Sequence, residues 1–200
     1  MKCILLSIRP QWVAKILNGE KTLEIRKSAP KDLPCEVYIY CTKGEPSISP
    51  FEFCENGRPP HIIGGEINGK VVAKFTLNKV LQIKKYQQNG LRYWAFGNED
   101  IAKRSLSPCE LSEHSCVSQE DLEKYLNGKE GYAWKISDLK IFGEPKELKE
   151  FNKAGAPTYE QTKAILRGGY TMEQHRKYLA RFGYAVTKAP QSYCYCEAEE

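Results

Sequence analysis

The sequence predicts an α+β protein in which a mainly antiparallel sheet closes into a small barrel with flanking helices. Strand patterns of mixed length are interrupted by single helices, without the regular βαβ spacing that produces a parallel sheet. The chain has 200 residues, of which 41% are hydrophobic and 28% charged, so it can bury one good core. We expect one domain over residues 1–150, and a helical extension with a closing strand over 151–200 packed on the same domain.

A strand, a helix and a second strand are expected at the N-terminus. Residues 3–8 form an apolar run. Pro10 suits the first turn of the helix that follows, and Gly19 ends that helix. Polar and apolar residues alternate over 22–26, so a strand there has its aliphatic side chains on one face and its Thr, Glu and Arg side chains on the other.

Similar patterns predict the later elements, with strands where β-branched and aromatic residues gather and helices where apolar residues recur at helical spacing. The expected strands cover residues 37–42, 70–83 as one long strand with a bulge near Asn78, 132–142 and 192–196. The expected helices are a polar stretch before residue 118, a helix capped by Ser118, and two helices at 158–167 and 171–182. A loop rich in Gly, Pro and Ser runs from residue 43 to about residue 68, and such long loops are usually functional.

Composition excludes several classes of protein. No run approaches the roughly 18 apolar residues of a membrane span, and the first apolar run is too short for a signal peptide, so we expect a cytoplasmic protein without membrane contact. The 30 basic and 25 acidic residues give a formal charge of +5, which is too mixed for a polybasic nucleic-acid coat.

Metal and cofactor motifs are absent from the sequence. The eight Cys residues are scattered without a Cys-x-x-Cys pair, so we expect most of them to be free thiols and predict no metal site. His61, His114 and His175 are isolated and are expected at the surface or as helix caps. Neither a Walker loop nor a dinucleotide-binding glycine pattern occurs, so we expect no cofactor.

The most informative stretch is Gly-Glu-Lys-Thr-Leu-Glu-Ile-Arg at residues 19–26. It delivers an ammonium at Lys21, a carboxylate at Glu24 and a guanidinium at Arg26 to one neighbourhood. Two cations can hold a phosphate or carbonyl oxygen, while the carboxylate can orient them or accept a base-edge N–H. The same residues also fit a solvated strand face, on which a Glu24–Arg26 ion pair contributes under about 1 kcal/mol.

The pattern Gly-x-Lys-x-x-Glu-x-Arg, with the strand Val-Tyr-Ile-Tyr-Cys-Thr after it and Tyr-Ala-Trp-x-Ile-Ser-x-Leu-Lys-Ile at 132–141, resembles the ASCH domain family. The resemblance covers about residues 2–150. It implies a barrel similar to the PUA fold and recognition of RNA or a modified nucleoside or nucleotide. The family motif carries over to Gly19, Lys21, Glu24 and Arg26, which makes these residues the expected rim of a ligand pocket.

The resemblance also leaves enzymatic alternatives open. One branch of the family is an amidohydrolase that removes the acetyl group of acetylated cytidine, with the motif Lys and a Thr nucleophile where this chain has Glu24. Thr22 is the nearby candidate for a displaced nucleophile, with Lys21 beside it as the base. Other members have been suggested to be ribonucleases, and here Glu24 could serve as the base while Lys21 and Arg26 stabilise the developing phosphorane charge.

Aromatic residues and the C-terminal helices add further candidates. The segment 190–195 resembles the closing segment of phage-type members, and Tyr193 there, like Tyr40 in the expected strand, could stack on a base. Core packing is the alternative role for both. A basic face on helix 171–182 could contact RNA or could be a solvated surface. A protein-interaction adaptor that uses the 43–68 loop and the last two helices is a further alternative, and the oligomeric state stays open.

Overall fold

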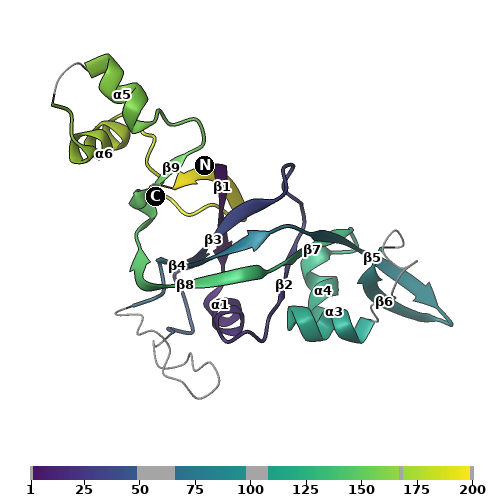
Figure 1. Ribbon diagram of the computed structural model, residues 1–200. Coiled ribbons are helices and arrows are strands. Elements are labelled where there is room, and N and C mark those ends of the chain that lie inside the picture. Colours follow the sequence, from purple (N-terminus) through teal and green to yellow (C-terminus); the bar gives the residue numbers. More distant parts are fainter. Residues whose placement is uncertain (1, 49–65, 98–107, 167–168, 199–200) are drawn as a thin grey trace.

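The structure is a computed structural model that describes residues 2–48, 66–97, 108–166 and 169–198 (Figure 1). Its strands form two sheets. The first sheet contains, in spatial order, β8 (Ser137–Lys146), β4 (Val71–Leu77), β3 (Cys35–Cys41), β1 (Lys2–Ile8), β10 (Tyr193–Ala198) and β9 (Phe151–Lys153). The second contains β2 (Leu23–Arg26), β7 (Gly131–Lys135), β5 (Val80–Gln88) and β6 (Leu91–Phe96). The described helices are α1 (Pro10–Leu17), α3 (Pro108–Ser115), α4 (Gln119–Leu126), α5 (Tyr159–Leu166), α6 (Met172–Arg181) and the 3-10 turn η2 (Leu148–Glu150).

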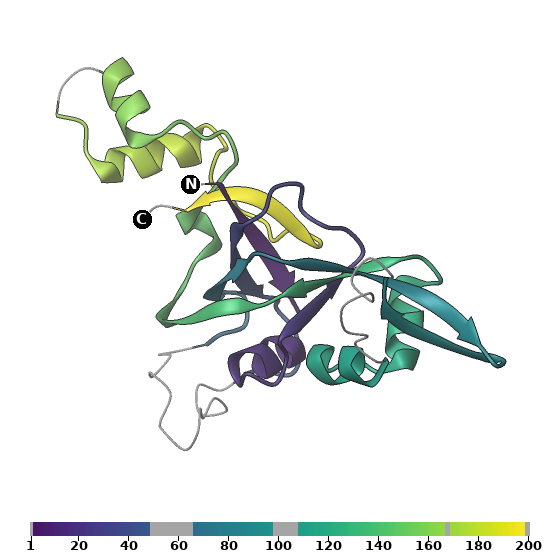
Figure 2. The ribbon, with the colours of Figure 1, turned by 45° about the vertical axis from the view of Figure 1, so that its right-hand side comes forward.

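Two chain segments run from one sheet into the other. β4 continues into β5 through Asn78 and Lys79, and β7 continues into β8 through Ile136. The amide of Lys135 donates to the Lys79 carbonyl at 3.0 Å, so hydrogen bonding continues across the junction. Of the strand pairs in the described residues, β1–β3 is the parallel one. The first sheet curls as a half-barrel (Figure 2), which confirms an α+β fold with a mainly antiparallel, barrel-like sheet.

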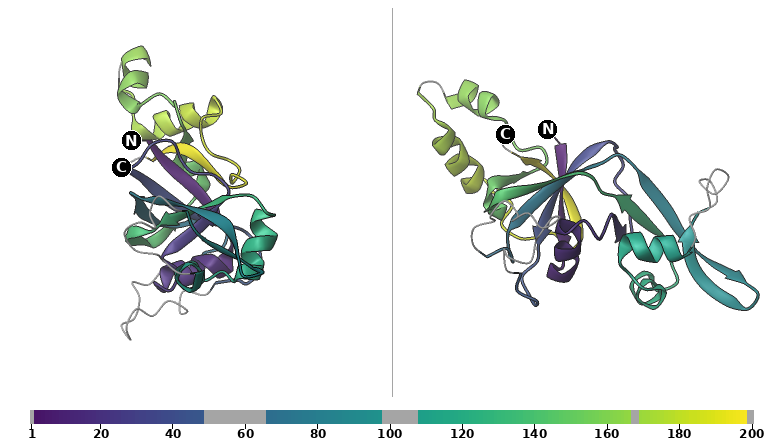
Figure 3. Two further views of the ribbon diagram at one scale, coloured as in Figure 1. Left: turned by 90° about the vertical axis from the view of Figure 1, so that its right-hand side faces the viewer. Right: turned by 60° about the horizontal axis from the view of Figure 1, so that its bottom comes forward.

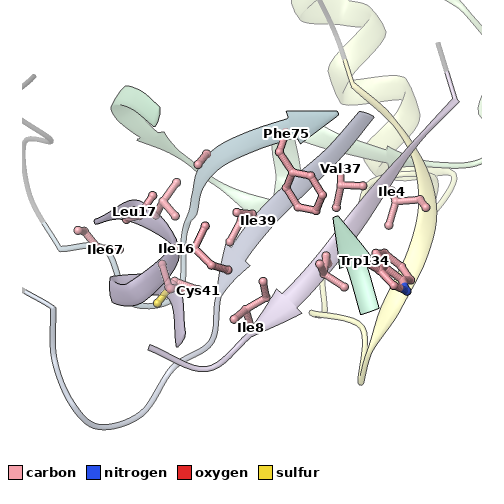
Figure 4. Packing of buried hydrophobic residues seen from close by; sticks show 14 of the residues in the cluster. Ile4, Ile8, Ile16, Leu17, Val37, Ile39, Cys41, Ile67, Phe75 and Trp134 are labelled. Carbon is pink, nitrogen blue, oxygen red and sulfur yellow. The ribbon is translucent and has the colours of Figure 1, made fainter. Parts of the chain in front are cut away.

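The main core lies between the curled sheet and α1 (Figure 4). Ile16 and Leu17 of α1 face Ile39 of β3 and Phe75 of β4, and all four are at most 1% exposed. Burial of each such side chain contributes about 1.5–3 kcal/mol. This packing fixes the end of α1, from which the chain turns into β2.

A second apolar cluster joins α3 and α4 to the second sheet. Leu122 and Leu126 of α4 pack with Leu23 and Ile25 of β2 in this cluster. The aliphatic face of β2 is therefore buried against α4, as the alternating pattern of residues 22–26 predicts. The polar side chains of β2, Glu24 and Arg26, lie on the opposite face of the strand, away from α4.

Most of the expected elements are present, with small shifts of their ends. The helix after Pro10 and the helix capped by Ser118 are confirmed, and the Ser118 side chain accepts a hydrogen bond from the Asp121 amide. The expected strands over 70–83 and 132–142 are each two strands in different sheets, because the chain passes from one sheet to the other at Asn78 and Lys79 and again at Ile136. Strand β6 was not expected. Residues 49–65 of the expected long loop lie outside the described residues.

The last fifty residues contribute both strands and helices. β10 lies between β1 and β9 in the first sheet, and the Sγ atoms of Cys3 and Cys196 on β1 and β10 are 2.8 Å apart. Helices α5 and α6 stand beyond the edge of the half-barrel (Figure 3). The expectation of a surface position for His175 is wrong: it is 3% exposed, because its ring packs edge-on against Tyr159 and Tyr170.

Within the described residues, no helix has the length and apolar character needed to cross a membrane. The same part of the chain contains no cluster of three or more His, Cys, Asp or Glu side chains placed to hold a metal ion. None of the seven described Cys residues forms a disulfide bond.

Candidate functional site

The turn between α1 and β2 positions the polar cluster. Gly19 adopts a left-handed conformation, with φ of 76°, and so reverses the chain at the end of α1. The Lys21 amide then donates to the Lys15 carbonyl at 3.0 Å, which holds the chain against the last turn of the helix. From here β2 starts, and its alternation directs Glu24 and Arg26 to the face opposite Leu23 and Ile25.

Lys21, Glu24 and Arg26 form one connected buried group, which we call the charged triad. Lys21 Nζ lies 3.3 Å from Glu24 Oε2, and Arg26 Nη2 lies 2.9 Å from Glu24 Oε1. Their side chains are 1%, 7% and 8% exposed, respectively. A solvated strand face is therefore excluded. The triad is a buried ion network, in which loss of one member leaves an uncompensated charge.

Backbone carbonyls from distant parts of the chain hold the two cations of the triad. Lys21 Nζ donates to the Ser115 carbonyl at the end of α3 at 2.5 Å. Arg26 Nη2 donates to the Ser7 carbonyl at the end of β1 at 2.7 Å, and Nη1 donates to Ser192 Oγ before β10 at 3.4 Å. Two cations and one carboxylate give the triad one excess positive charge. This excess favours a ligand that carries a negative charge or a strong acceptor.

A pocket of about 770 Å³ opens on the triad. Its walls come from the end of β1, the start of α1, strand β2, helix α4 and the segment before β10. The lining residues include Ser7, Arg9, Gln11, Trp12, Lys21, Glu24, Arg26, Thr42, Asp121, Lys124, Tyr125, Pro190, Gln191 and Ser192. The volume lies within the range of about 300–1,000 Å³ that is common for small-molecule and cofactor sites.

Two aromatic side chains line the pocket, and neither was among the expected site residues. Trp12 on α1 is half-buried, and Lys21 Nζ lies 5.2 Å from the centroid of its ring. Tyr125 on α4 is 40% exposed. Burial raises the pKa of Tyr125, the Arg26 charge opposes that rise and the Glu24 charge adds to it, so the phenol is electrostatically coupled to the triad. The helical spacing of Trp12 was visible in the sequence, but its position beside Lys21 was not.

The segment 190–192 is a further part of the site, and it belongs to the stretch 190–195 that the sequence analysis selected for Tyr193. Pro190, Gln191 and Ser192 line the pocket. The Ser7 amide donates to the Ser192 carbonyl at 2.9 Å, which joins this segment to β1. The last fifty residues therefore supply one wall of the pocket.

The structure separates the other sequence-predicted residues from the triad. Thr22 is exposed, does not line the pocket, and has its hydroxyl 3.1 Å from His114 Nδ1. Tyr40 is 4% exposed and belongs to an apolar cluster with Phe151. The Tyr193 hydroxyl donates to the Ala29 carbonyl at 3.1 Å, and its ring packs edge-on against Trp134. Both tyrosines thus have packing roles, and neither lines the pocket.

Three comparisons with known proteins complete the description of the chain. No family model matches it, and neither does any curated protein. A solved structure of ASCH from Zymomonas mobilis is similar, with a TM-score of 0.47 and 15% identity, covering 96% of this chain and 85% of that chain. A serine-to-alanine mutant of that protein has a TM-score of 0.48 and 16% identity, covering 96% of this chain and 86% of that chain. A tyrosine-to-phenylalanine mutant has a TM-score of 0.43 and 14% identity, covering 89% of this chain and 96% of that chain.

Proposed function

We propose that the chain is an RNA- or nucleotide-binding module of the ASCH type, with its ligand in the pocket over the charged triad. One observation carries the proposal: a buried ion network with one excess positive charge forms the wall of an open pocket. A purely structural network would satisfy its own charges, since burying a net charge is costly. The motif at 19–26 that resembles the ASCH family lies in this same network.

Each part of the pocket has a chemical role in this proposal. Lys21 and Arg26 attract a phosphate or carbonyl oxygen, and Glu24 holds both cations in place or accepts a base-edge N–H. Trp12 and Tyr125 offer aromatic surface for a base, because stacking on aromatic side chains is the common mode of single-stranded RNA recognition. Arg9, exposed and also lining the pocket, adds positive charge that attracts the anionic chain.

Binding to a panel of RNA oligomers and modified nucleosides tests the proposal, with thermal shift and mass spectrometry as readouts. The parent is expected to bind at low salt and to lose affinity as salt rises. Lys21→Ala and Arg26→Ala are expected to weaken binding. Lys129→Ala removes an exposed charge outside the pocket and is the control. Equal binding by the parent and both pocket variants would exclude this site, and no binding by any probe would favour the adaptor alternative.

A hydrolase is the second candidate, favoured by the 3.3 Å contact between Lys21 Nζ and Glu24 Oε2 in the pocket. Such a pair can exchange a proton with a substrate in either a ribonuclease or a nucleoside amidohydrolase reaction. Thr22 is outside the pocket, so water, or the 2′-hydroxyl of RNA, would be the nucleophile. Product formation by the parent that is lost in Glu24→Gln, with ligand binding retained, would establish catalysis. Absence of any mass change in the panel would leave binding as the function.

A further inference from the structure

Two buried thiols face each other across the pairing of β1 with β10. Cys3 on β1 lies directly opposite Cys196 on β10, and their Sγ atoms are 2.8 Å apart. The two residues are 2% and 0% exposed and belong to the apolar cluster that includes Tyr38 and Phe151. Their strands come from the two ends of the described chain and run side by side (Figure 1). Neither thiol has a role in the proposed function.

The backbone holds this pair at a spacing that a disulfide can span. Directly opposed residues of an antiparallel pair have Cα atoms about 4.5 or 5.5 Å apart, and disulfides join Cα atoms that are about 4.4–6.8 Å apart. A disulfide bond is about 2.05 Å long, so the sulfurs of Cys3 and Cys196 need to approach each other by less than about 1 Å. Oxidation of this pair therefore requires no change in the register of the two strands.

A third thiol on the same face of β10 connects the pair to solvent. Cys194 is two residues before Cys196, so the alternation of a strand places both on one face, and Cys194 packs against the same apolar cluster. Cys194 is half-buried, and burial, followed by the charge of Cys3, raises its pKa. Of these three thiols, Cys194 is the one that a small oxidant in solution can reach, and it is electrostatically coupled to the Cys3 sulfur.

We propose that Cys3 and Cys196 form a redox-controlled clamp between the first and last strands, with Cys194 as the thiol that first reacts with a disulfide oxidant such as oxidised glutathione. The Cys194 thiolate attacks one sulfur of the oxidant, whose S–S bond breaks and releases one reduced glutathione. Cys3 then attacks the Cys194 sulfur and releases the second glutathione, and Cys196 attacks the Cys3 sulfur and returns Cys194 to a thiol. The two electrons and two thiol protons of the pair are taken up by the two glutathione molecules.

The clamp goes beyond the proposed function and does not depend on it, but it reaches the same pocket. Segment 190–192, which lines the pocket, leads directly into β10, and the Ser7 amide donates to the Ser192 carbonyl at the other end of the β1–β10 pairing. The cross-link joins residues 193 positions apart, and cross-links that close long loops restrict the unfolded chain most. Oxidation therefore stabilises the fold and fixes the strand that carries one pocket wall.

Equilibration of the parent in glutathione buffers, from fully reduced to fully oxidised, tests the clamp. We expect a product that lacks two hydrogens and that mass spectrometric mapping assigns to a linkage between Cys3 and Cys196. Its melting temperature should exceed that of the reduced protein by at least about 5 °C. A main product linked through another pair, a glutathione adduct that never resolves to an internal disulfide, or an oxidised protein that melts no higher than the reduced one would overturn the proposal.

Variants of the two paired thiols locate the effect. Cys3→Ala and Cys196→Ala each remove one thiol, and neither should gain melting temperature in oxidising buffer. Comparison of each variant with its own reduced form cancels any packing that the substitution removes. Cys35→Ala is the matched control, because Cys35 is also half-buried but packs against the main core on the other face of the sheet, and it should gain melting temperature like the parent. A rise that persists in either variant of the pair would reject the clamp.

The rate of disulfide formation tests the role of Cys194. Because the thiolate is the attacking species, the raised pKa of Cys194 makes the first step slow at pH 7 and faster at pH 8, so the clamp responds to sustained oxidation. Cys194→Ala should slow formation of the disulfide at least about tenfold without changing its final extent, whereas Cys35→Ala should not slow it. An unchanged rate in Cys194→Ala would refute entry through Cys194, and a lower final extent would show that the disulfide contains Cys194 instead of Cys196 or Cys3.

Hydrogen exchange tests the link to the pocket wall. The Ser7 amide, which donates to the Ser192 carbonyl, should exchange more slowly in the oxidised protein than in the reduced protein. Cys196→Ala should show the same Ser7 exchange rate in both buffers. Equal exchange in the oxidised and reduced parent would contradict an effect of the clamp on this wall.

Discussion

The carboxylate of Glu24 lies 2.9 Å from the guanidinium of Arg26, two residues along the same face of β2. Both side chains are more than nine-tenths buried, so neither charge is compensated by bulk water. Glu24→Gln would leave the two cations of the triad without their carboxylate. We expect it to reduce the free energy of unfolding by about 3 to 5 kcal/mol, as when one partner of a buried ion pair is removed.

Chemical denaturation of the parent and Glu24→Gln measures this loss, with Glu120→Gln as the matched control. Glu120 pairs with Lys124 at 2.7 Å, but their side chains are 78% and 67% exposed. Removal of that pair should change stability by less than about 0.5 kcal/mol. Equal losses in the free energy of unfolding for the two variants would show that burial of the triad does not strengthen its contribution to stability.

The aromatic side chains of the pocket give a second prediction. Tyr125→Ala is expected to weaken binding of single-stranded RNA by about 1 to 3 kcal/mol, the usual contribution of one stacked base. Folding should be little affected, because Tyr125 is 40% exposed. Phe182→Ala, which removes an aromatic ring 58% exposed next to the C-terminal helices, is the control. Weaker binding in Phe182→Ala alone would place the RNA on α6 and not in the pocket.

A pH-dependent contact between α4 and the β5–β6 hairpin gives the third prediction. The pKa of Glu123 lies below its ordinary value, mainly because Lys85 donates a hydrogen bond to the carboxylate and to a smaller extent because Trp94 donates another. A depressed carboxyl pKa means that this stabilisation is present at neutral pH and is lost as pH falls through the folded-state pKa. Glu123→Gln should therefore melt at a slightly lower temperature than the parent at pH 7.

The difference in melting temperature between the parent and Glu123→Gln should disappear once the pH falls below the folded-state pKa of Glu123, where the carboxyl is protonated in both the folded and unfolded states. A difference that does not shrink as the pH is lowered would show that Glu123 acts through packing and not through its charge.

Thiol reactivity gives the fourth prediction. Burial raises the pKa of Cys41 to about 12, and burial, followed by the Asp32 charge, raises that of Cys35 to about 11. Because the thiolate is the nucleophile, both should resist alkylation at pH 8 in the folded state. Among the cysteines that the structure describes, Cys109 is exposed and should react first. Mass spectrometry of the chain alkylated for increasing times measures the order, and early modification of Cys41 would show that β3 opens readily.

The sequence predicted the triad because it is local. Residues 19–26 contain the turn, the strand and all three charges, and the period-2 alternation places Glu24 and Arg26 on one face. It did not predict the other walls of the pocket, since Tyr125 and Ser192 reach the triad only through long-range packing of α4 and β10. Local patterns do not encode such contacts.

The missed strand β6 had a local signal. Asn89 and Gly90 join β5 to β6 with φ of 51° and 80°, and an Asn-Gly pair between strand patterns is a strong indication of a tight hairpin. Tyr40 and Tyr193 were expected to contact the ligand, but neither lines the pocket, and the reason is different. A tyrosine in a strand pattern has the same sequence signature whether it packs in the core or binds a base.

The pairing of β1 with β10 has a consequence for how the protein is made. The directly opposed residues Cys3 and Cys196 are separated by 193 positions in the chain. Ribosomes add about 5–20 residues per second, so the first strand emerges roughly 10 to 40 s before its partner is synthesised. During that interval one edge of the apolar strand Cys-Ile-Leu-Leu stays unpaired and open to aggregation. Nascent chains should therefore depend on chaperones that shield this segment, and synthesis of β10, not emergence of the motif, would be the step at which the pocket is completed.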